Sequence, residues 1–220
     1  MHVTFETVKE SEEIKTYIRQ ADASLLALGY TEHSFAHVMR CADLAGRWLV
    51  MLGHDEHEAD LARIAGYMHD IGNIVNRSDH AQSGAIMAFT LLDKLGMSPG
   101  DIATIVTAIG NHDEATATPV NAVAAALILA DKTDVRRSRV RGQDKEPAGI
   151  HGRVNYAVEK AATVLDVQTR TLTLRLEVDT NMCSVMDYFE IFLDRMLLCR
   201  RAADYFNLRF QLNINGTALM

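Results

Sequence analysis

Apolar residues recur at helical spacing through most of the first 140 residues, and this pattern restricts the possible folds more than any other feature of the chain. Glycines, and serine or threonine followed by proline, interrupt the pattern where helices would end or begin. Each helix would carry an apolar stripe that must be buried against its neighbours, so we predict a mainly α fold built as a helical bundle. The expected helices cover residues 11–28, 31–52, 55–69, 82–95, 98–110 and 118–134.

The hydrophobic pattern changes near residue 140. Polar residues punctuated by glycine and proline indicate a basic, polar loop at residues 141–150, after a helical domain at residues 1–140. Residues 151–220 are predicted to form a small α+β region, because alternating apolar and polar side chains are typical of half-buried strands. Its predicted elements are helices at residues 153–165 and 185–205 and strands at residues 171–178 and 210–214.

The edges of those two strands need partners, because unpaired edges tend to associate with other chains. Val3 and Phe5 could pair with one edge, or a second subunit could, which makes a homodimer one of the expected outcomes. The sequence leaves open whether the two strands run parallel. It also leaves open whether the C-terminal region serves dimerisation or forms a cap over a site in the helical domain.

Composition limits the class of protein. The 220-residue chain is 48% hydrophobic and 23% charged, which excludes a disordered or low-complexity protein. Its formal charge of −7 disfavours nucleic-acid polymers and membranes as partners. The sequence shows no signal-peptide pattern and no apolar run of bilayer length, so a cytoplasmic location is expected. The three cysteines are widely spaced without a CxxC pair, and they predict neither disulfides nor a thiolate zinc site.

Several histidines and aspartates sit at helix ends or on apolar helices, where their polar groups would be buried. His69-Asp70 closes one apolar helix, and Asp131 follows the apolar run at residues 122–130. An unpaired buried charge costs roughly several kcal/mol, so a metal or an ion pair is expected to compensate it. Mixed imidazole and carboxylate ligands suit Fe, Mn or Zn, and six of them are enough for two ions. The six candidate ligands are His37, His69, Asp70, His80, His112 and Asp131.

Two motifs stand out in this set, His37-Val-Met-Arg40 and His69-Asp70-Ile-Gly72, and the late Asp131 follows them. In this order they resemble the HD-domain metal-dependent phosphohydrolase superfamily. The additional His80 and His112 make the chain similar to the dinuclear-metal branch of that family. The resemblance covers about residues 24–140. It implies an HD-domain helical bundle, with the C-terminal α+β region as an appendage that the resemblance does not reach.

The resemblance also implies a cofactor and a reaction. Two divalent ions (Fe, Mn, Zn or Mg) would be bridged by Asp70, and a metal-bridged hydroxide would attack phosphorus. Asp70 and Lys132 would be the catalytic residues. The first ion would be held by His37, His69, Asp70 and Asp131, and the site of the second would be completed by His80 and His112.

Basic residues after Asp131 are expected to bind the substrate. Lys132, Arg136 and Arg137 would contact phosphate oxygens, which the planar guanidinium group fits well. The alternative for this basic strip is a solvated helix end. His33 shares a helix face with His37 and is expected to contact the substrate, to be a further metal ligand or to support the ligands; the alternative is a local hydrogen bond.

The implied function is cleavage of a phosphate ester or anhydride in a small phosphorylated substrate, with a nucleotide-like compound favoured. The Gly-Tyr-Pro motif of the cyclic di-GMP branch does not follow His112, which disfavours that substrate. Asn73 stands where many family members carry lysine, and together with the C-terminal region it motivates an alternative. That alternative is a nucleotide-binding regulator without turnover. An HD-type di-iron oxygenase is a third, less favoured hypothesis for the function.

Overall fold

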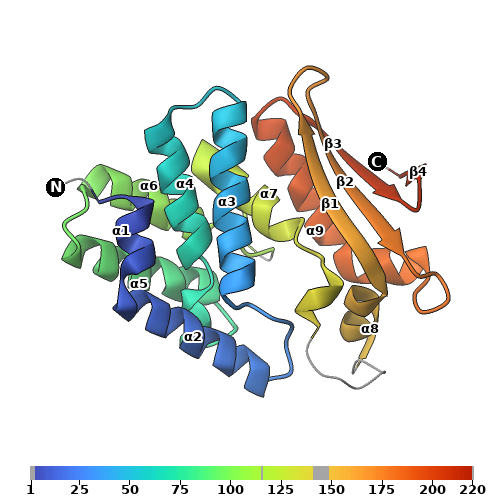
Figure 1. Cartoon of the computed structure of the whole chain (residues 1–220), viewed down its shortest axis with the longest axis horizontal. Helices are drawn as coiled ribbons and strands as arrows, with labels where there is room; N and C mark the ends of the chain where they lie inside the picture. The colour runs from blue at the N-terminus through green and yellow to red at the C-terminus, as the bar shows by residue number, and fades with distance from the viewer. Residues whose placement is uncertain (1–2, 115, 141–148, 220) are drawn as a thin grey trace.

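Most helices of the N-terminal part begin at a residue whose side chain caps them. Figure 1 shows the computed structural model of the chain, which describes residues 3–114, 116–140 and 149–219. Ser34, Ser98 and Asn121 each accept a hydrogen bond from a backbone N–H of the first helical turn. The elements of this part are α1 (Phe5–Glu10), α2 (Glu12–Ala27), α3 (Phe35–Met51), α4 (Glu56–Met68), the 3-10 turn η1 (Ile71–Ile74), α5 (His80–Lys94), α6 (Pro99–Gly110), α7 (Ala122–Lys132) and the 3-10 turn η2 (Arg137–Arg139).

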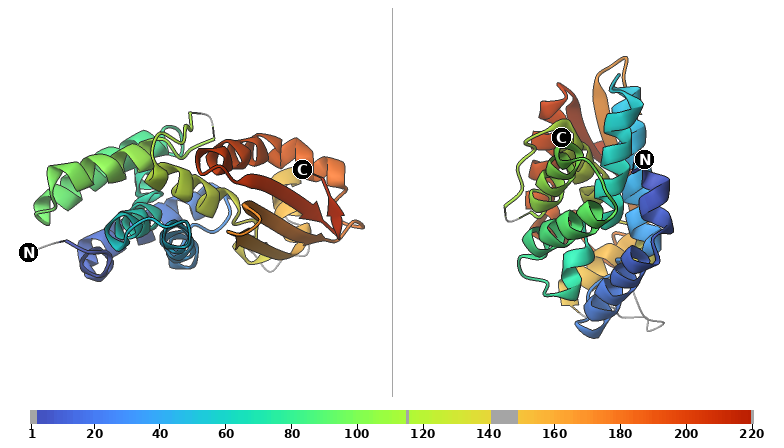
Figure 2. Two further views of the ribbon diagram at one scale, coloured as in Figure 1. Left: turned by 90° about the horizontal axis from the view of Figure 1, so that it is seen from above. Right: turned by 90° about the vertical axis from the view of Figure 1, so that its left-hand side faces the viewer.

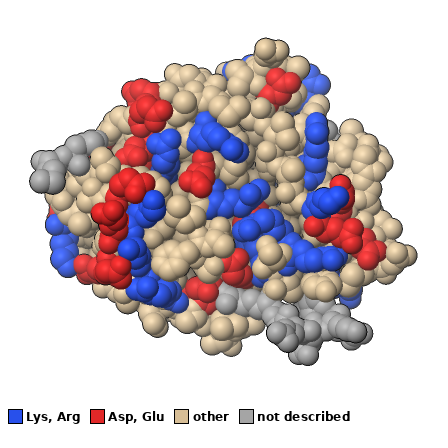
Figure 3. Space-filling view, in the orientation of Figure 1, with Lys and Arg blue, Asp and Glu red and all other residues tan. Residues whose placement is uncertain are grey.

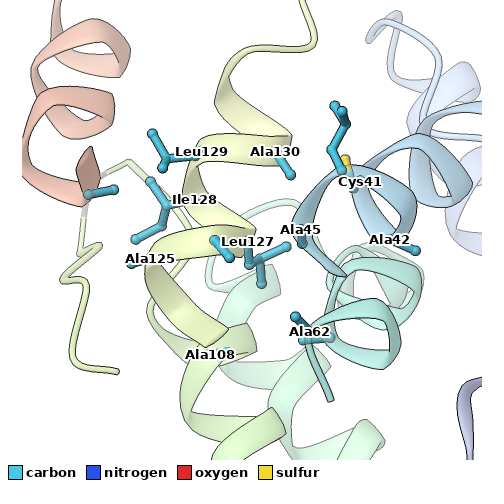
Figure 4. Packing of buried hydrophobic residues seen from close by; sticks show 14 of the residues in the cluster. Cys41, Ala42, Ala45, Ala62, Ala108, Ala125, Leu127, Ile128, Leu129 and Ala130 are labelled. Carbon is cyan, nitrogen blue, oxygen red and sulfur yellow. The ribbon is translucent and has the colours of Figure 1, made fainter. Parts of the chain in front are cut away.

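Helix α7 lies inside the bundle, and all of its residues are buried. Figure 4 shows its alanine and leucine side chains packed among small residues of α3, α4 and α6. α3 and α4 lie side by side, and a Cβ added at Gly66 would come within 2.7 Å of the backbone nitrogen of Ala42. Small side chains therefore let the helices approach closely, and Asp131 follows at the end of the buried helix.

The C-terminal region pairs a four-stranded sheet with two helices. The strand order is β1-β2-β3-β4, with antiparallel pairs at both ends and a parallel β2–β3 pair in the middle. α9 connects β2 to β3, covers the sheet and also packs on α7, so it joins the sheet to the bundle (Figure 2). The elements are α8 (Gly149–Ala157), β1 (Val158–Asp166), β2 (Thr171–Val178), α9 (Val185–Tyr205), β3 (Arg209–Ile214) and β4 (Thr217–Ala218).

The structure confirms the mainly α fold class with a small C-terminal sheet, and it corrects two predictions. The helix expected at residues 153–165 is wrong in its second half, because residues 158–166 form β1. There, pairing with β2 along nearly the whole strand outweighs local helix propensity. Phe5 lies in α1 and pairs with no strand, whereas β4 covers the edge of β3. Of the loop predicted at residues 141–150, residues 141–148 lie outside the described part and the last two begin α8.

Among the described residues, no helix combines the length and the apolar character that crossing a membrane would require.

Candidate metal centre

The structure brings together all six candidate ligands, which five different segments supply. His37 lies on α3, the doublet His69-Asp70 lies where α4 gives way to η1, and His80 is the first residue of α5. The side chains meet inside the bundle, because each segment turns its polar residue toward the end of buried α7. None of the six is more than 8% exposed: His37, His69, Asp70, His80, His112 and Asp131.

The two carboxylate oxygens of Asp70 face different groups of histidines. Its Oδ2 lies 3.1 Å from His69 Nε2 and 3.6 Å from His37 Nε2. Its Oδ1 lies 3.7 Å from His80 Nε2, which in turn lies 3.2 Å from His112 Nε2. Asp131 joins the first group, with its Oδ1 3.3 Å from His37 Nε2. Asp70 therefore stands between the two groups.

Hydrogen bonds at the Nδ1 atoms fix how the histidine rings present their Nε2 atoms. The Nδ1 atoms of His69 and His112 lie 2.8 Å and 2.6 Å from the carbonyl oxygens of Gly66 and Ile109. His80 Nδ1 lies 3.1 Å from the carbonyl oxygen of Arg77, three residues before it. A carbonyl oxygen can only accept, so each Nδ1 must carry the hydrogen. In the neutral ring, Nε2 then offers a lone pair toward the cluster.

His37 is oriented in the same way by a carboxylate that the sequence analysis missed. Its Nδ1 donates to Oδ2 of Asp134 over 2.8 Å. Asp134 is buried and also accepts from Arg136. Burial alone would raise the pKa of Asp134, but these hydrogen bonds and the nearby charge of Arg139 hold it well below its usual range. A charged carboxylate behind a histidine is a common support for a metal ligand.

These lone pairs and carboxylate oxygens face one another, and a cation between them would satisfy both. His69 Nε2 and Asp70 Oδ2 are buried, and neither has a hydrogen-bond partner within the described residues. Burial would lower the pKa of His69, yet the neighbouring Asp70 and Asp131 raise it above its ordinary value. The cluster therefore favours positive charge at this point, which a metal ion would supply.

The donor set fits divalent metal ions. Donor atoms of His69, Asp70 and His112 lie within 4.8 Å of one another, and those of His37, His69 and Asp131 do so as well. Imidazole and carboxylate ligands together suit Fe, Mn or Zn. Cys41 also places its Sγ within the second group, one turn after His37 on α3. Burial and the nearby aspartates raise the pKa of the Cys41 thiol well above its ordinary value, which disfavours the thiolate that a metal would need.

Asn73 supports this centre in place of the lysine expected there. Its side-chain Nδ2 donates to Oδ1 of Asp70 over 3.0 Å and to the Asp70 carbonyl over 2.9 Å. It is buried and neutral, so it orients Asp70 without pairing with its charge.

A cavity of about 630 Å³ opens over the cluster. Asp70 and Asp131 lie at its lining together with His33 and Lys132, two of the residues expected to meet the substrate. His33 also forms the alternative local contact, because its Nδ1 donates to the Thr31 carbonyl over 2.7 Å. The other charged residues that line the cavity are Arg77, Glu114, Arg139 and Arg195.

Lys132 lines the cavity but is held by carboxylates. Its Nζ lies 2.7 Å from Asp131 Oδ2 and 3.7 Å from Glu114 Oε1. Burial would lower the pKa of Lys132, and the charges of these two carboxylates raise it instead. Its ammonium group therefore fixes one oxygen of Asp131 while the other oxygen faces the histidines.

Arg136 and Arg137 are not brought to the cavity, so the structure does not place them as the expected phosphate clamp. Basic side chains gather across the middle of the face in Figure 3, over the junction of the bundle and the C-terminal region. Arg136 donates to Oδ1 of Asp134. Arg137 donates to the carbonyl of Tyr156 and stacks over its ring at 4.7 Å. Both side chains thus serve packing and ion pairs.

Comparison with known proteins finds a family match over the segment that holds this centre. Residues 34–136 match the family model of the HD domain. No curated protein matches the chain. Among solved structures, it is similar to a predicted HD superfamily hydrolase from an uncultured Thermotogales bacterium. The two are 27% identical with a TM-score of 0.45, over 56% of this chain and 67% of the other. The helical segment at residues 34–136, which carries the whole cluster of histidines and aspartates, is an HD domain.

Proposed function

We propose that this protein is a metal-dependent phosphohydrolase that cleaves a phosphate ester or anhydride of a small phosphorylated metabolite, with nucleotides as the favoured class. The HD domain and the buried cluster support the coarser statement of a metal-dependent hydrolase. One observation carries the finer proposal: a set of facing lone pairs and carboxylates forms one wall of a cavity that basic side chains also line.

The charge of the cavity favours an anionic substrate. Among the described residues, four cationic side chains line it, against the carboxylates of Asp70, Asp131 and Glu114. Asp70 and Asp131 face the histidine cluster, so bound divalent ions would neutralise them. The remaining charge of the cavity would then be strongly positive. Such a field suits phosphate, and it offsets locally the acidic balance of the chain as a whole.

The chain's own residues would position the reactants. His37, His69 and Asp131 would hold one divalent ion and His80 and His112 the other, with Asp70 shared between them. When bound, such ions polarise phosphoryl oxygens and lower the pKa of a coordinated water. Asn73 orients Asp70, and Asp134 orients His37, each through a side-chain hydrogen bond. Lys132 keeps Asp131 oriented through their ion pair.

A phosphate-release screen tests this proposal. Purified protein would be freed of metal by a chelator and then supplied with Mn²⁺, Mg²⁺, Zn²⁺ or, without oxygen, Fe²⁺. We expect release from at least one phosphomonoester, dinucleoside polyphosphate or cyclic dinucleotide, lost with the chelator and restored by the metal.

Two outcomes would contradict the proposal. In one, the protein binds a nucleotide tightly and leaves it intact for hours, as expected for a regulator without turnover. In the other, metal-loaded protein releases no phosphate from any compound but consumes oxygen with a polyol, as expected for an oxygenase.

A further inference from the structure

Helix α9 reaches the cavity from outside the HD segment. Phe192 and Arg195 on α9 line it, as do Gly152 and Asn155 on α8, although the family match ends at residue 136. α9 packs directly on α7, which carries Asp131 and Lys132. The C-terminal region therefore forms part of the cavity wall, together with members of the cluster of histidines and aspartates.

Arg195 is anchored on one side only. Its Nε donates to Oε1 of Glu114 over 2.7 Å, and its guanidinium group lies 4.7 Å from the centre of the Phe192 ring. Within the described residues, neither Nη atom has a hydrogen-bond partner, and the side chain keeps 21% of its surface exposed. A planar guanidinium held at Nε presents its two Nη groups as a fork, which is the geometry that recognises phosphate oxygens.

The other cations of the cavity are more fully engaged. Lys132 lies between Asp131 and Glu114. Arg139 donates from Nε to the carbonyl of Glu32 and from Nη1 to that of Asp134. Arg77 donates from Nη1 to Asn73, lies beside the ring of His80 and stacks over Tyr30 at 5.6 Å. Of these four side chains, Arg195 keeps the most donors available for an incoming anion.

We propose that the C-terminal region completes the substrate site and that Arg195 on α9 binds the phosphoryl group of the substrate through its two Nη atoms. The inference rests on the proposed function in that the ligand is taken to be a phosphoryl group. Glu114 holds the guanidinium at Nε, and Phe192 supports its face. An anion bound there lies against the same wall as the metal ligands Asp131 and His112.

Phosphate binding tests the inference without relying on turnover. Inorganic phosphate would be titrated calorimetrically into the whole 220-residue chain as purified, at fixed ionic strength. Arg195→Ala should weaken phosphate affinity roughly 10- to 100-fold, because a charge-assisted contact to the anion is lost. Arg195→Lys should recover part of that loss, since it restores the charge without the fork. Arg200→Ala is the matched control, because Arg200 lies exposed on the same helix and does not line the cavity.

A second variant separates direct contact from a role through Glu114. If Arg195 merely balances the charge of Glu114, the double variant Arg195→Ala with Glu114→Gln should bind phosphate about as tightly as the wild type, because no unbalanced carboxylate remains. If Arg195 contacts phosphate, the double variant should bind it clearly more weakly than Glu114→Gln alone, because the guanidinium contact is missing. Melting temperatures of all variants would show that each is folded.

The outcomes distinguish this inference from the proposed function. If Arg195→Ala loses phosphate affinity but the wild type hydrolyses no compound, Arg195 binds an anion and the proposed phosphohydrolase function is wrong. Metal-dependent hydrolysis with unchanged phosphate affinity in a folded Arg195→Ala would overturn the role of Arg195 alone. A wild-type protein that binds no phosphate at millimolar concentration would also contradict the inference.

Discussion

Replacing Asp70 by asparagine should lower metal-dependent phosphate release by more than about 100-fold. Removing a residue that only orients a metal ligand already lowers metal affinity or activity about 10- to 100-fold, and Asp70 would be a ligand itself. Among the described residues, Asp70 is the one carboxylate whose two oxygens face both groups of histidines. Asparagine has nearly the same shape and keeps an oxygen for the hydrogen bond from Asn73. The substitution therefore removes the charge and spares the local structure.

Metal-induced stabilisation provides a second measurement for Asp70→Asn. A ligand that binds only the folded state raises the melting temperature. Mn²⁺ should stabilise the wild type clearly and Asp70→Asn little, while the two metal-free proteins melt at similar temperatures. Asp93→Asn, an exposed carboxylate on α5, should behave as the wild type in both measurements. An Asp70→Asn protein that keeps full turnover would show that Asp70 does not hold the metals.

Replacing Gly72 by alanine should destabilise the protein by about 3 kcal/mol or more, because the added Cβ enters an already packed backbone contact. That Cβ would collide with the carbonyl oxygen of His80 and the backbone nitrogen of Gly84, and would lie 2.8 Å from Ser83 Oγ. Backbone cannot yield as a flexible side chain can. The start of α5 would have to move away from η1 and take His80 with it.

Chemical denaturation measures the Gly72→Ala effect as a change in the free energy of unfolding. Gly100→Ala is the matched control, because a Cβ at that position in α6 would have no other part of the described structure within 4 Å beyond its own helix backbone and chain neighbours. Alanine in a helix should make Gly100→Ala neutral or slightly stabilising. Metal binding by Gly72→Ala should also weaken, since His80 leaves its place beside Asp70 and His112. Unchanged stability in Gly72→Ala would contradict the close packing of η1 against α5.

The helical bundle and its six clustered residues could be predicted because their signals are local. The cap at Ser98 marks a helix start, and apolar periodicity marks the buried faces. The helix expected from residue 31 begins instead at Phe35, where Ser34 rather than Thr31 is the cap. The position of Asp131 after an entirely apolar run indicated a buried carboxylate before any fold was known. Buried polar groups need partners, so residue types and burial together pointed to a metal cluster.

The remaining features depend on contacts between distant segments. β1 forms because residues 158–166 pair with β2, which no pattern within the segment itself reveals. Arg136 and Arg137 seemed suited to phosphate because they follow Asp131 closely, but the buried Asp134 draws Arg136 away. An aspartate three residues after a ligand, followed by several arginines, was the signal that could have revealed this. Arg195 reaches the cavity only because α9 packs on α7, and the sequence carries no trace of that contact.

The metal content of the purified protein tests the central claim most directly. Wild-type protein would be dialysed against Mn²⁺, freed of excess ions and analysed for its elements, with Asp70→Asn and Asp93→Asn treated alongside. The centre described here predicts two ions per chain in the wild type and in Asp93→Asn, and a clear loss in Asp70→Asn. A wild-type protein that retains no divalent ion, or an Asp70→Asn variant that retains two, would contradict it.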